Sequence, residues 1–413
     1  MTNWRNALGG FDVLMVRPMT PLTDENPKRI LQKAVLDAGL VEFLEQADQR
    51  ASPVTLLLND PDRFTDSRTA LEVVLQVAEE HNLQPHYRAL FATGSHSFSA
   101  DQMHRHEEQV LPRAGEFLFE KAWHNCRNPD TVSATGEVHL HKWVAEAEHL
   151  LVIGSMEPHY FAGVTGAHKT LTVGVMSYES LCNNHCHAMS RLAGGLKTHG
   201  NPVHEGIAAT VSNLISNGRS VFAVNEVLVE QRIVGCFAGG PLESLESGLP
   251  LVREIYSHCL GEEADLAVAC VGPPLNKSLY QADKGIKNVE NAVRDGGVIL
   301  LDASCHEGIG IDRFMQLMKR ASSYEDAVDL VRAEGYRLGD HKAVRLRALT
   351  QKRGVRLGII SRHLGKQEAR VAGLEPFADA AAAVRWARET LGSEGTKAVL
   401  VEDAGNTTLT LQD

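Results

Sequence analysis

The sequence predicts two α/β domains whose sheets are mainly parallel. Short apolar runs alternate with longer helical patterns along all 413 residues. Such alternation is typical of parallel strands joined by helices. The pattern restarts at Leu266, after Gly261-Glu262-Glu263, and we place a domain boundary there. The chain length suits two or three domains, because one domain usually has roughly 100–200 residues.

Composition argues against several classes of protein. The net charge is −11 and no basic run stands out, which disfavours binding to nucleic acid or to an anionic membrane surface. No stretch approaches the roughly 20 apolar residues that span a bilayer, and the N-terminus lacks the apolar segment of a secretory signal. Seven scattered cysteines indicate reduced thiols. We therefore expect a cytoplasmic protein.

The first domain is predicted to cover residues 1–261. Its expected strands, in order, are 13–16, 54–58, 87–92, 150–153, 221–224 and 227–234. Apolar residues at helical spacing predict helices over 28–47, 69–78, 100–110, 177–187, 203–214 and 242–260. Residues 111–136, rich in Asn, Arg, Gly and Pro, are expected to be irregular.

The second domain is predicted to cover residues 262–403, with residues 404–413 as a tail that returns to the first domain. Its expected strands are 266–271, 298–304, 357–360 and 398–401. Helices are expected over 279–293, 313–321, 324–334 and 380–391. This order again favours a parallel sheet covered by helices.

Polar clusters follow the ends of several predicted strands in both domains. They are Asp60–Arg63, Thr93–His96, Glu157–His159, Pro273–Lys277 and Ser304–Gly308. Ligands of open α/β sheets bind beyond the carboxyl ends of the strands. We therefore expect the active site in a cleft between the two domains.

The stretch from Glu157 to His187 is the richest in reactive groups, with four histidines, two cysteines and Lys169. Glycines beside Lys169 allow a close approach of the backbone to a ligand, so this lysine is a candidate phosphate ligand or amine nucleophile. A solvated surface lysine is the alternative. Cys182, His185 and Cys186 do not have the spacing of a structural zinc site, although His185 suits a single metal ligand.

Two histidines and one arginine after strand ends are further candidates. His96 and His159 suit general acid/base chemistry, with loop-capping or structural histidines as the alternative. Arg63 suits a planar carboxylate, because its guanidinium can bind one with two hydrogen bonds. Gln281 and Lys284 lie three apart on one helical face and suit an anion, whereas a solvated face is the alternative.

Taken together, these clusters resemble the lactate racemase family, whose enzymes use a nickel-pincer nucleotide. The matching residues occur in the family's order over about residues 55–310. They are Asp60-x2-Arg63, Thr93-Gly94-x-His96, Pro158-His159-Tyr160-Phe161-Ala162-Gly163, Gly166-x-x-Lys169, Asn184-His185, Asn201-Pro202-x-His204-Glu205, Leu275-Asn276-Lys277 and Tyr280-Gln281-x2-Lys284-Gly285.

The resemblance implies a role for each matching residue. Lys169 would carry the cofactor through a thioamide bond, and His185 would be the protein's ligand to nickel. His96 and His159 would be the acid/base pair, one on each side of the substrate. The resemblance further assigns substrate binding to Arg63 and Lys284, and cofactor binding to Asp60, Tyr280, Gln281 and Lys284.

The implied reaction is racemisation or epimerisation of a 2-hydroxy acid by hydride transfer from C2 and return to the opposite face. Maturation would need the enzymes that synthesise the cofactor. His168 precedes the lysine, Asp62-Arg63-Phe64 surrounds the arginine, and Ser97 follows His96, where the family often differs. These departures predict a substrate other than lactate.

Two other functions are compatible with the residues. A histidine-based metal-dependent hydrolase would hold its metal with two or more protein ligands and leave Lys169 unmodified. A non-catalytic homologue would bind a hydroxy acid without isotope exchange at C2.

Overall fold

The computed structural model describes residues 3–19, 25–50, 52–111, 117–392 and 397–412 and divides into two compact units. The N-terminal unit comprises residues 20–185 and 196–255. The C-terminal unit comprises residues 1–19, 186–195 and 256–413. Each contains a six-stranded sheet in which neighbouring strands are mainly parallel, so the predicted fold class is confirmed.

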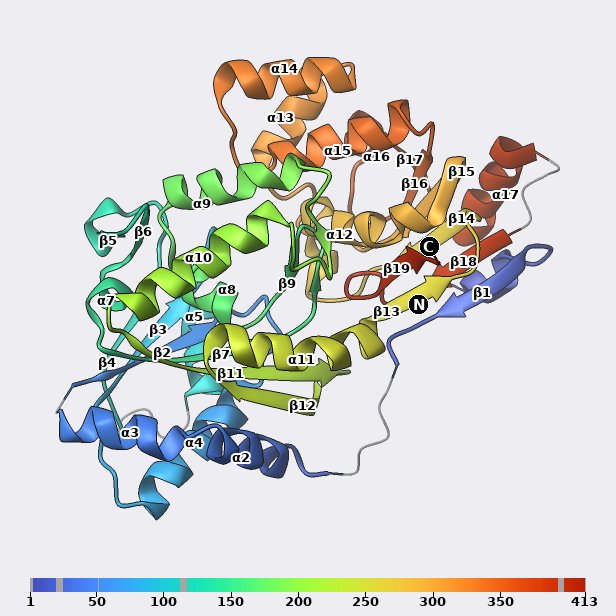
Figure 1. The fold of residues 1–413 in the computed structure, drawn as a ribbon. Helices are drawn as coiled ribbons and strands as arrows, with labels where there is room; N and C mark the ends of the chain where they lie inside the picture. The colour runs from blue at the N-terminus through green and yellow to red at the C-terminus, as the bar shows by residue number, and fades with distance from the viewer. Residues whose placement is uncertain (1–2, 20–24, 51, 112–116, 393–396, 413) are drawn as a thin grey trace. The chain divides into compact units, whose positions relative to one another are not determined.

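The N-terminal unit contains most of the elements before residue 256 (Figure 1). They are α2 (Pro27–Asp37), α3 (Leu40–Gln49), β2 (Val54–Asn59), α4 (Ser67–Glu80), β3 (Tyr87–Ala92), α5 (Ala100–Val110), β4 (Leu118–Trp123), η1 (Pro129–Thr131), β5 (Val132–Thr135), β6 (Val138–His141), α7 (Lys142–Glu146), β7 (His149–Ser155), β8 (Pro158–His159), β9 (Ala162–Val164), α8 (Ala167–Leu171), η2 (Val173–Val175), α9 (Tyr178–His185), α10 (Pro202–Ser216), β11 (Ser220–Val229), β12 (Arg232–Gly239) and α11 (Pro241–Tyr256).

The sheet of this unit has the order β12-β11-β7-β2-β3-β4. All neighbouring pairs are parallel except the β11–β12 hairpin at one edge. The chain runs outward from β2 through β3 to β4, and then returns to place β7 on the other side of β2. The order of strands therefore reverses between β2 and β7.

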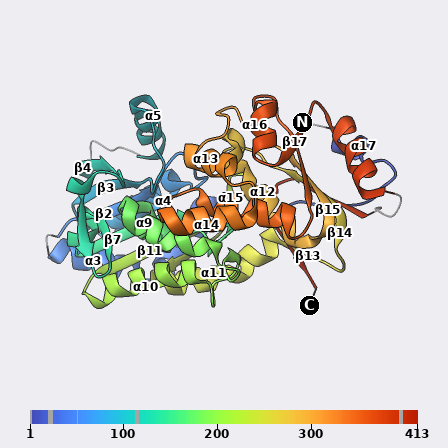
Figure 2. The same ribbon diagram turned by 90° about the horizontal axis from the view of Figure 1, so that it is seen from above.

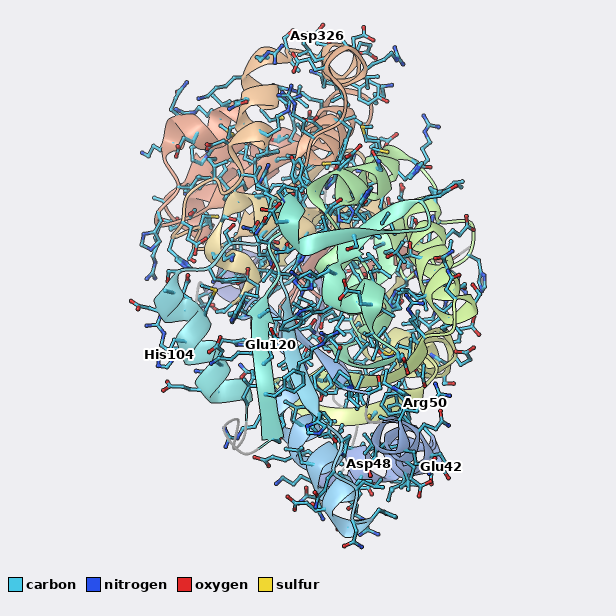
Figure 3. The ribbon with its side chains drawn as sticks, turned by 90° about the vertical axis from the view of Figure 1, so that its left-hand side faces the viewer. Glu42, Asp48, Arg50, His104, Glu120 and Asp326 are labelled. Carbon is cyan, nitrogen blue, oxygen red and sulfur yellow. The ribbon has the colours of Figure 1, made fainter. Side chains whose placement is uncertain are left out.

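Apolar side chains of α2, α3 and α4 pack on one face of this sheet, against strand residues such as Leu56 and Leu151. The polar side of α3 faces outward, as Figure 3 shows for Glu42 and Asp48 and, just beyond the helix, Arg50. A single helix was expected over 28–47, but Gly39 adopts a left-handed φ of 84° and separates α2 from α3. Glycine tolerates this conformation because it has no Cβ.

Two other expectations for this unit are wrong. Residues 221–229 are not divided between two strands but lie in one strand, β11; the second predicted strand, 227–234, instead spans a turn at Glu230 and Gln231, where φ is 50° and 66°, and the start of β12. Within the stretch expected to be irregular, β4 and β5 form; residues 112–116 lie outside the described residues. Edge strands such as β4 carry a weak apolar signal because they are partly exposed.

The C-terminal unit contains the remaining elements. They are α1 (Trp4–Ala7), β1 (Asp12–Val16), η3 (Cys186–Met189), β10 (Gly194–Gly195), β13 (Ser257–Leu260), β14 (Ala264–Cys270), η4 (Leu275–Lys277), α12 (Leu279–Val289), η5 (Glu290–Ala292), β15 (Val293–Asp302), α13 (Asp312–Arg320), α14 (Tyr324–Glu334), α15 (Asp340–Gln351), β16 (Arg356–Ile360), α16 (Lys366–Val371), β17 (Leu374–Phe377), α17 (Ala380–Leu391), β18 (Lys397–Val401) and β19 (Thr408–Leu411).

Its six-stranded sheet is parallel throughout, in the order β1-β18-β14-β15-β16-β17. Helices α12 to α16 pack on one face, whereas α1 and α17 pack on the other. Figure 2 shows α17 and α12 on either side of the strands of this unit. The N-terminal strand β1 pairs with β18, so residues 1–19 belong here rather than with the domain 1–261 in which the sequence analysis placed them.

The last strand, β19, pairs in parallel with β13. Residues 257–260 were expected to end a helix over 242–260, but they form β13 because they pair with the C-terminal strand. Among the described residues, no helix is long and apolar enough to cross a membrane.

A buried network of charges joins α12 to α15. Lys342 and Asp283 have side chains only 1% and 0% exposed, and their charged atoms lie 3.4 Å apart. Arg345 contacts both Asp283 and Glu290. Burial lowers the pKa of Lys342 to about 8, although Asp283 opposes this effect. Lys287 also pairs with Glu290, so three cations and two anions lie together at this junction.

Substitution of Asp283 tests this network. Asp283→Asn should lower the free energy of unfolding by about 3–5 kcal/mol, because it leaves the buried Lys342 without its anion and Arg345 with only Glu290. Denaturant titration would measure this. The control Asp329→Asn removes an exposed partner of Arg332 and should cost less than about 1 kcal/mol. Equal effects of the two substitutions would contradict the prediction.

Candidate functional site

The candidate residues of the N-terminal unit gather where its strand order reverses. Asp60 and Arg63 follow β2, and His96 follows β3. Glu157 and His159 follow β7, which pairs with β2 on the other side. Parallel strands end at the same edge of a sheet, and the reversal leaves a crevice there. The sequence predicts that these residues lie at one edge of the sheet. The strand order places them near the middle of that edge, because β7 and β2 are the central strands.

Asp60 and His96 form a direct contact. Asp60 is 3% exposed, and its Oδ2 lies 2.9 Å from Nδ1 of His96. Burial disfavours the charged carboxylate, but His96 and Arg63 outweigh this and hold the pKa of Asp60 below its usual value. An ionised Asp60 accepts a hydrogen bond from Nδ1–H, so the neutral His96 ring keeps its lone pair on Nε2. His96 is thus arranged as a base.

Asp62 lies close to the same imidazole, with Oδ2 at 3.5 Å from Nδ1 of His96. Within the described part of the chain, Asp60, Asp62 and His96 form a group of possible metal ligands whose donor atoms lie within 4.8 Å of one another.

Arg63 pairs with Glu157, and the charged atoms lie 3.8 Å apart. The two side chains are 22% and 19% exposed, so this pair is partly open to solvent. Pairs of this kind contribute at most about 1 kcal/mol. An incoming carboxylate can therefore compete with Glu157 for the guanidinium.

His159 is 6% exposed in the short strand β8. Its Nδ1 accepts a hydrogen bond from the Ala162 N–H at 3.2 Å, so the neutral ring carries its proton on Nε2. The ring stacks on Tyr160 and meets the edge of Phe161. Gly163 follows with φ of 83°, and a Cβ there would lie 2.4 Å from the carbonyl oxygen of Lys197. Only glycine fits this turn.

Lys169 lies on α8 and is 7% exposed. The start of α8 is held by Asn225, whose Oδ1 accepts a 2.8 Å hydrogen bond from the Ala167 N–H. A Cβ on Gly154 of β7 would lie 2.6 Å from the Ala167 nitrogen, so the helix packs directly on the strand. The lysine is therefore a buried amine on a fixed backbone, unlike the solvated surface lysine considered as an alternative.

His185 ends α9 and is 9% exposed. Burial, together with the positive charge of Lys169, lowers its pKa to about 3, so the imidazole is neutral. Its Nδ1 lies 3.1 Å from Oδ1 of Asn184 and donates to it, which leaves the lone pair on Nε2. Metal-binding histidines usually have this arrangement, in which the second nitrogen is fixed by a hydrogen bond.

Tyr280, Gln281 and Lys284 lie on α12 of the C-terminal unit. Lys342 donates from Nζ to the Tyr280 carbonyl oxygen at 2.5 Å and lies 4.3 Å from the centre of its ring. The buried network around Asp283 thus fixes the first turns of the helix that carries these three residues.

His168 and His204 are buried beside the lysine, with ring centres 5.3 Å apart. Both nitrogens of His168 and Nδ1 of His204 lack a hydrogen-bond partner among the described residues. Burial, His204 and Lys169 hold the pKa of His168 well below its usual value. The imidazole beside Lys169 is therefore neutral.

Sequence reasoning missed the polar residues that support the site. Thr170 donates to Asn59, Asn59 to Thr65, and Thr65 to Ser155 through side-chain hydrogen bonds. Glu226, opposite Ser155 in the β7–β11 pair, is fully buried and accepts a 2.8 Å bond from the Asp66 N–H. A glutamate within an apolar strand was the signal that could have identified it.

Two family models match the chain: the lactate racemase N-terminal domain over residues 12–194, and the lactate racemase C-terminal domain over residues 261–402. The lactate racemase of Thermoanaerobacterium thermosaccharolyticum is 28% identical over 323 residues, which cover 74% of this chain and 72% of that protein. The lactate racemase of Lactiplantibacillus plantarum is 27% identical over 283 residues, covering 66% of this chain and 64% of the relative.

Solved structures show the same fold. The lactate racemase apoprotein from T. thermosaccharolyticum superposes with a TM-score of 0.83 at 22% identity, covering 96% of this chain and 94% of that one. A protein from Thermotoga maritima superposes with a TM-score of 0.68 at 16% identity, covering 96% and 100%. The fold and both domain matches define an α/β enzyme of the isomerase class, a racemase. The chain belongs to the lactate racemase family.

The pH dependence of stability tests the burial of Glu226. Burial, and then Asp66, raises its pKa to about 8 from 4.5. The folded state therefore keeps a proton that the unfolded state releases, and stability should fall as the pH rises from 4.5 to 8, by at most roughly 1.4 kcal/mol for each pH unit.

Glu226→Gln keeps an acceptor for the Asp66 N–H but cannot ionise. Its free energy of unfolding should therefore decrease less between pH 4.5 and 8 than that of the natural chain. Urea unfolding at several pH values would measure the difference between the variant and the natural chain. Glu230→Gln, in the exposed turn after β11, is the control and should change nothing. Identical pH profiles for all three proteins would refute the assignment.

Proposed function

We propose that this racemase interconverts the configuration at C2 of a 2-hydroxy acid with a nickel-pincer nucleotide joined to Lys169. The observation that carries the proposal is the buried pair of Lys169 and His185. A neutral imidazole of depressed pKa beside a buried amine suits a tether and a metal ligand better than it suits packing. Both curated relatives described above are lactate racemases, which supports the same class of substrate.

The residues fit the implied cofactor. Lys169 offers the amine for a thioamide, and Nε2 of His185 offers a lone pair to nickel because Nδ1 donates to Asn184. Imidazole is a suitable nickel ligand. When bound, the nucleotide would supply the acceptor for the hydride of C2. The protein's own residues then have to bind the acid, orient it and move the hydroxyl proton.

His96 is the proposed base for that proton. Its Nε2 carries the lone pair, and Asp60 stabilises the imidazolium that forms when the substrate hydroxyl loses its proton. This is the arrangement by which a buried carboxylate orients and supports a catalytic histidine.

His159 is the proposed partner on the other side of the substrate. With Nδ1 occupied by the Ala162 N–H, its Nε2–H can donate to the substrate oxygen. One ring thus presents a lone pair and the other an N–H, which is what a proton-transfer pair requires.

Arg63 is proposed to bind the substrate carboxylate, displacing Glu157 from the guanidinium. Asp60 is proposed to contribute to cofactor binding as well as orienting His96. On α12, Tyr280, Gln281 and Lys284 are proposed to contact the cofactor, and Lys284 also the substrate. The buried charges around Asp283 hold that helix in one conformation.

We further propose that the substrate is not lactate. Phe64, beside the carboxylate-binding arginine, exposes 37% of its surface, and Glu157 places a negative charge near the same guanidinium. A larger hydroxy acid with further hydroxyl groups can contact both side chains, which a methyl group cannot. The seven cysteines form no disulfide in the described part of the chain, which suits the reducing cytoplasm, where the cofactor-synthesis enzymes would meet the chain.

Loading is tested by producing the chain together with the cofactor-synthesis enzymes. Intact mass should show an added nucleotide, and metal analysis should show nickel. Lys169→Ala should abolish the added mass, His185→Ala should lower the nickel content, and Lys197→Ala, an exposed lysine of the same unit, should change neither.

An unmodified Lys169 and the absence of nickel under these conditions would contradict the proposed cofactor. A different metal held by Asp60, Asp62 and His96 would then indicate the hydrolase alternative. Ligand binding without exchange at C2 would indicate the non-catalytic homologue.

The acid/base pair is tested on loaded protein. His96→Ala and His159→Ala should keep the cofactor mass but lower turnover by about 10²–10⁴-fold, the usual contribution of a positioned acid or base. Loss of optical rotation of a single enantiomer measures turnover. His104→Ala, on the exposed surface of α5 (Figure 3), is the control. Near-full activity in either variant would remove that histidine from the mechanism.

A further inference from the structure

The C-terminal unit contains a cavity of about 780 Å³ that the proposed mechanism does not use. This volume lies within the range of about 300–1,000 Å³ that is usual for small-molecule sites. The cavity is lined by residues at the carboxyl ends of β14, β15, β16 and β18 and by the N-terminal segment around Trp4. All of these elements belong to the same unit.

The cavity lies where the strand order of this sheet reverses. The chain leaves β14 and runs outward through β15, β16 and β17, and then returns to place β18 on the other side of β14. The helices change face at the same point, because α12 packs on one face and α17 on the other. Ligands of open parallel sheets bind in this crevice, and the candidate site of the N-terminal unit occupies the equivalent position between β2 and β7.

The lining of the cavity includes an arginine, Arg362, that suits an anion, although Asp302 and Glu402 place negative charge there as well. Arg5 and Glu402 pair with each other at 3.3 Å, and Asp302 accepts a 2.8 Å hydrogen bond from the indole N–H of Trp4. Arg362 and His363 follow β16 and line the cavity, and both are exposed to solvent at its rim. Within the described residues, the side chain of neither takes part in a hydrogen bond or ion pair. An unpaired guanidinium is the group that most often binds phosphate.

The rest of the lining indicates what the anion is attached to. Val271, Ile360 and Leu400 provide an apolar surface on which a flat ring, such as a nucleobase, can pack. The carboxylate of Asp302 ends the second strand of a strand–helix–strand unit, the position that accepts ribose hydroxyls in nucleotide-binding sheets. The first turn reads Gly272-Pro273-Pro274-Leu275 instead of a glycine-rich loop, so a pyrophosphate at the start of α12 is excluded.

We propose that this crevice binds a nucleoside monophosphate, with the phosphate on Arg362 and the ribose near Asp302. The proposal does not depend on the racemase chemistry, because every residue that it uses belongs to the cavity of the C-terminal unit. It can therefore be tested on the full chain without cofactor loading.

Calorimetric titration with AMP is the test. AMP should bind saturably, and Arg362→Ala should weaken binding at least tenfold, whereas Arg385→Ala, an exposed arginine of α17 outside the cavity, should leave it unchanged. Adenosine and inorganic phosphate are titrated separately to measure what the nucleoside and the phosphate each contribute. Each should bind at least tenfold more weakly than AMP.

A second variant fills the crevice. A Cβ on Gly272 would meet no atom within 4 Å, so Gly272→Val can project into the cavity without displacing its neighbours. It should abolish AMP binding while the thermal unfolding temperature is retained. Absence of saturable AMP binding in the millimolar range overturns the proposal. Binding that survives Arg362→Ala or Gly272→Val, or that adenosine or phosphate alone reproduces, also overturns it.

Discussion

The reversal of strand order in each parallel sheet is the constraint on which the remaining features of this protein depend. Parallel strands need long crossovers, so their carboxyl ends all reach one edge of the sheet. Where neighbouring crossovers leave toward opposite faces, the edge opens. In the N-terminal unit this opening lies between β2 and β7, and it collects Asp60, His96 and His159 from three separate strand ends.

Burial then sets the protonation of these groups. The pKa of Asp60 lies below its usual value because His96 and Arg63 offset the cost of its burial, whereas burial raises the pKa of Glu226 to about 8. His185 is neutral because it shares a buried region with Lys169. The N-terminal unit thus holds a charged carboxylate, a neutral carboxyl and a neutral imidazole, whose protonation is set by burial and neighbouring charges.

The C-terminal unit repeats the sheet topology with a different set of side chains. Its buried charges lie between α12 and α15, where they fix a helix, and its crevice is lined by Arg362 together with apolar and acidic side chains. The reversal of strand order therefore explains the position of both the proposed catalytic residues and the proposed nucleotide site.

The sequence by itself determined the fold class, the main parallel strands and the family, because apolar runs and short motifs are local properties. It also identified Lys169, His185, His96 and Arg63 as candidates, since reactive side chains after strand ends are visible without coordinates. It misjudged the helix around Gly39, whose left-handed φ is a single-residue effect, and strand β13, which exists because it pairs with β19 from the other end of the chain.

Only the tertiary structure decided that Asp60 fixes the tautomer of His96, that Glu157 competes for Arg63 and that Glu226 supports the loop after β2. Those relations depend on distances between residues 36 to 160 positions apart, which no local pattern encodes.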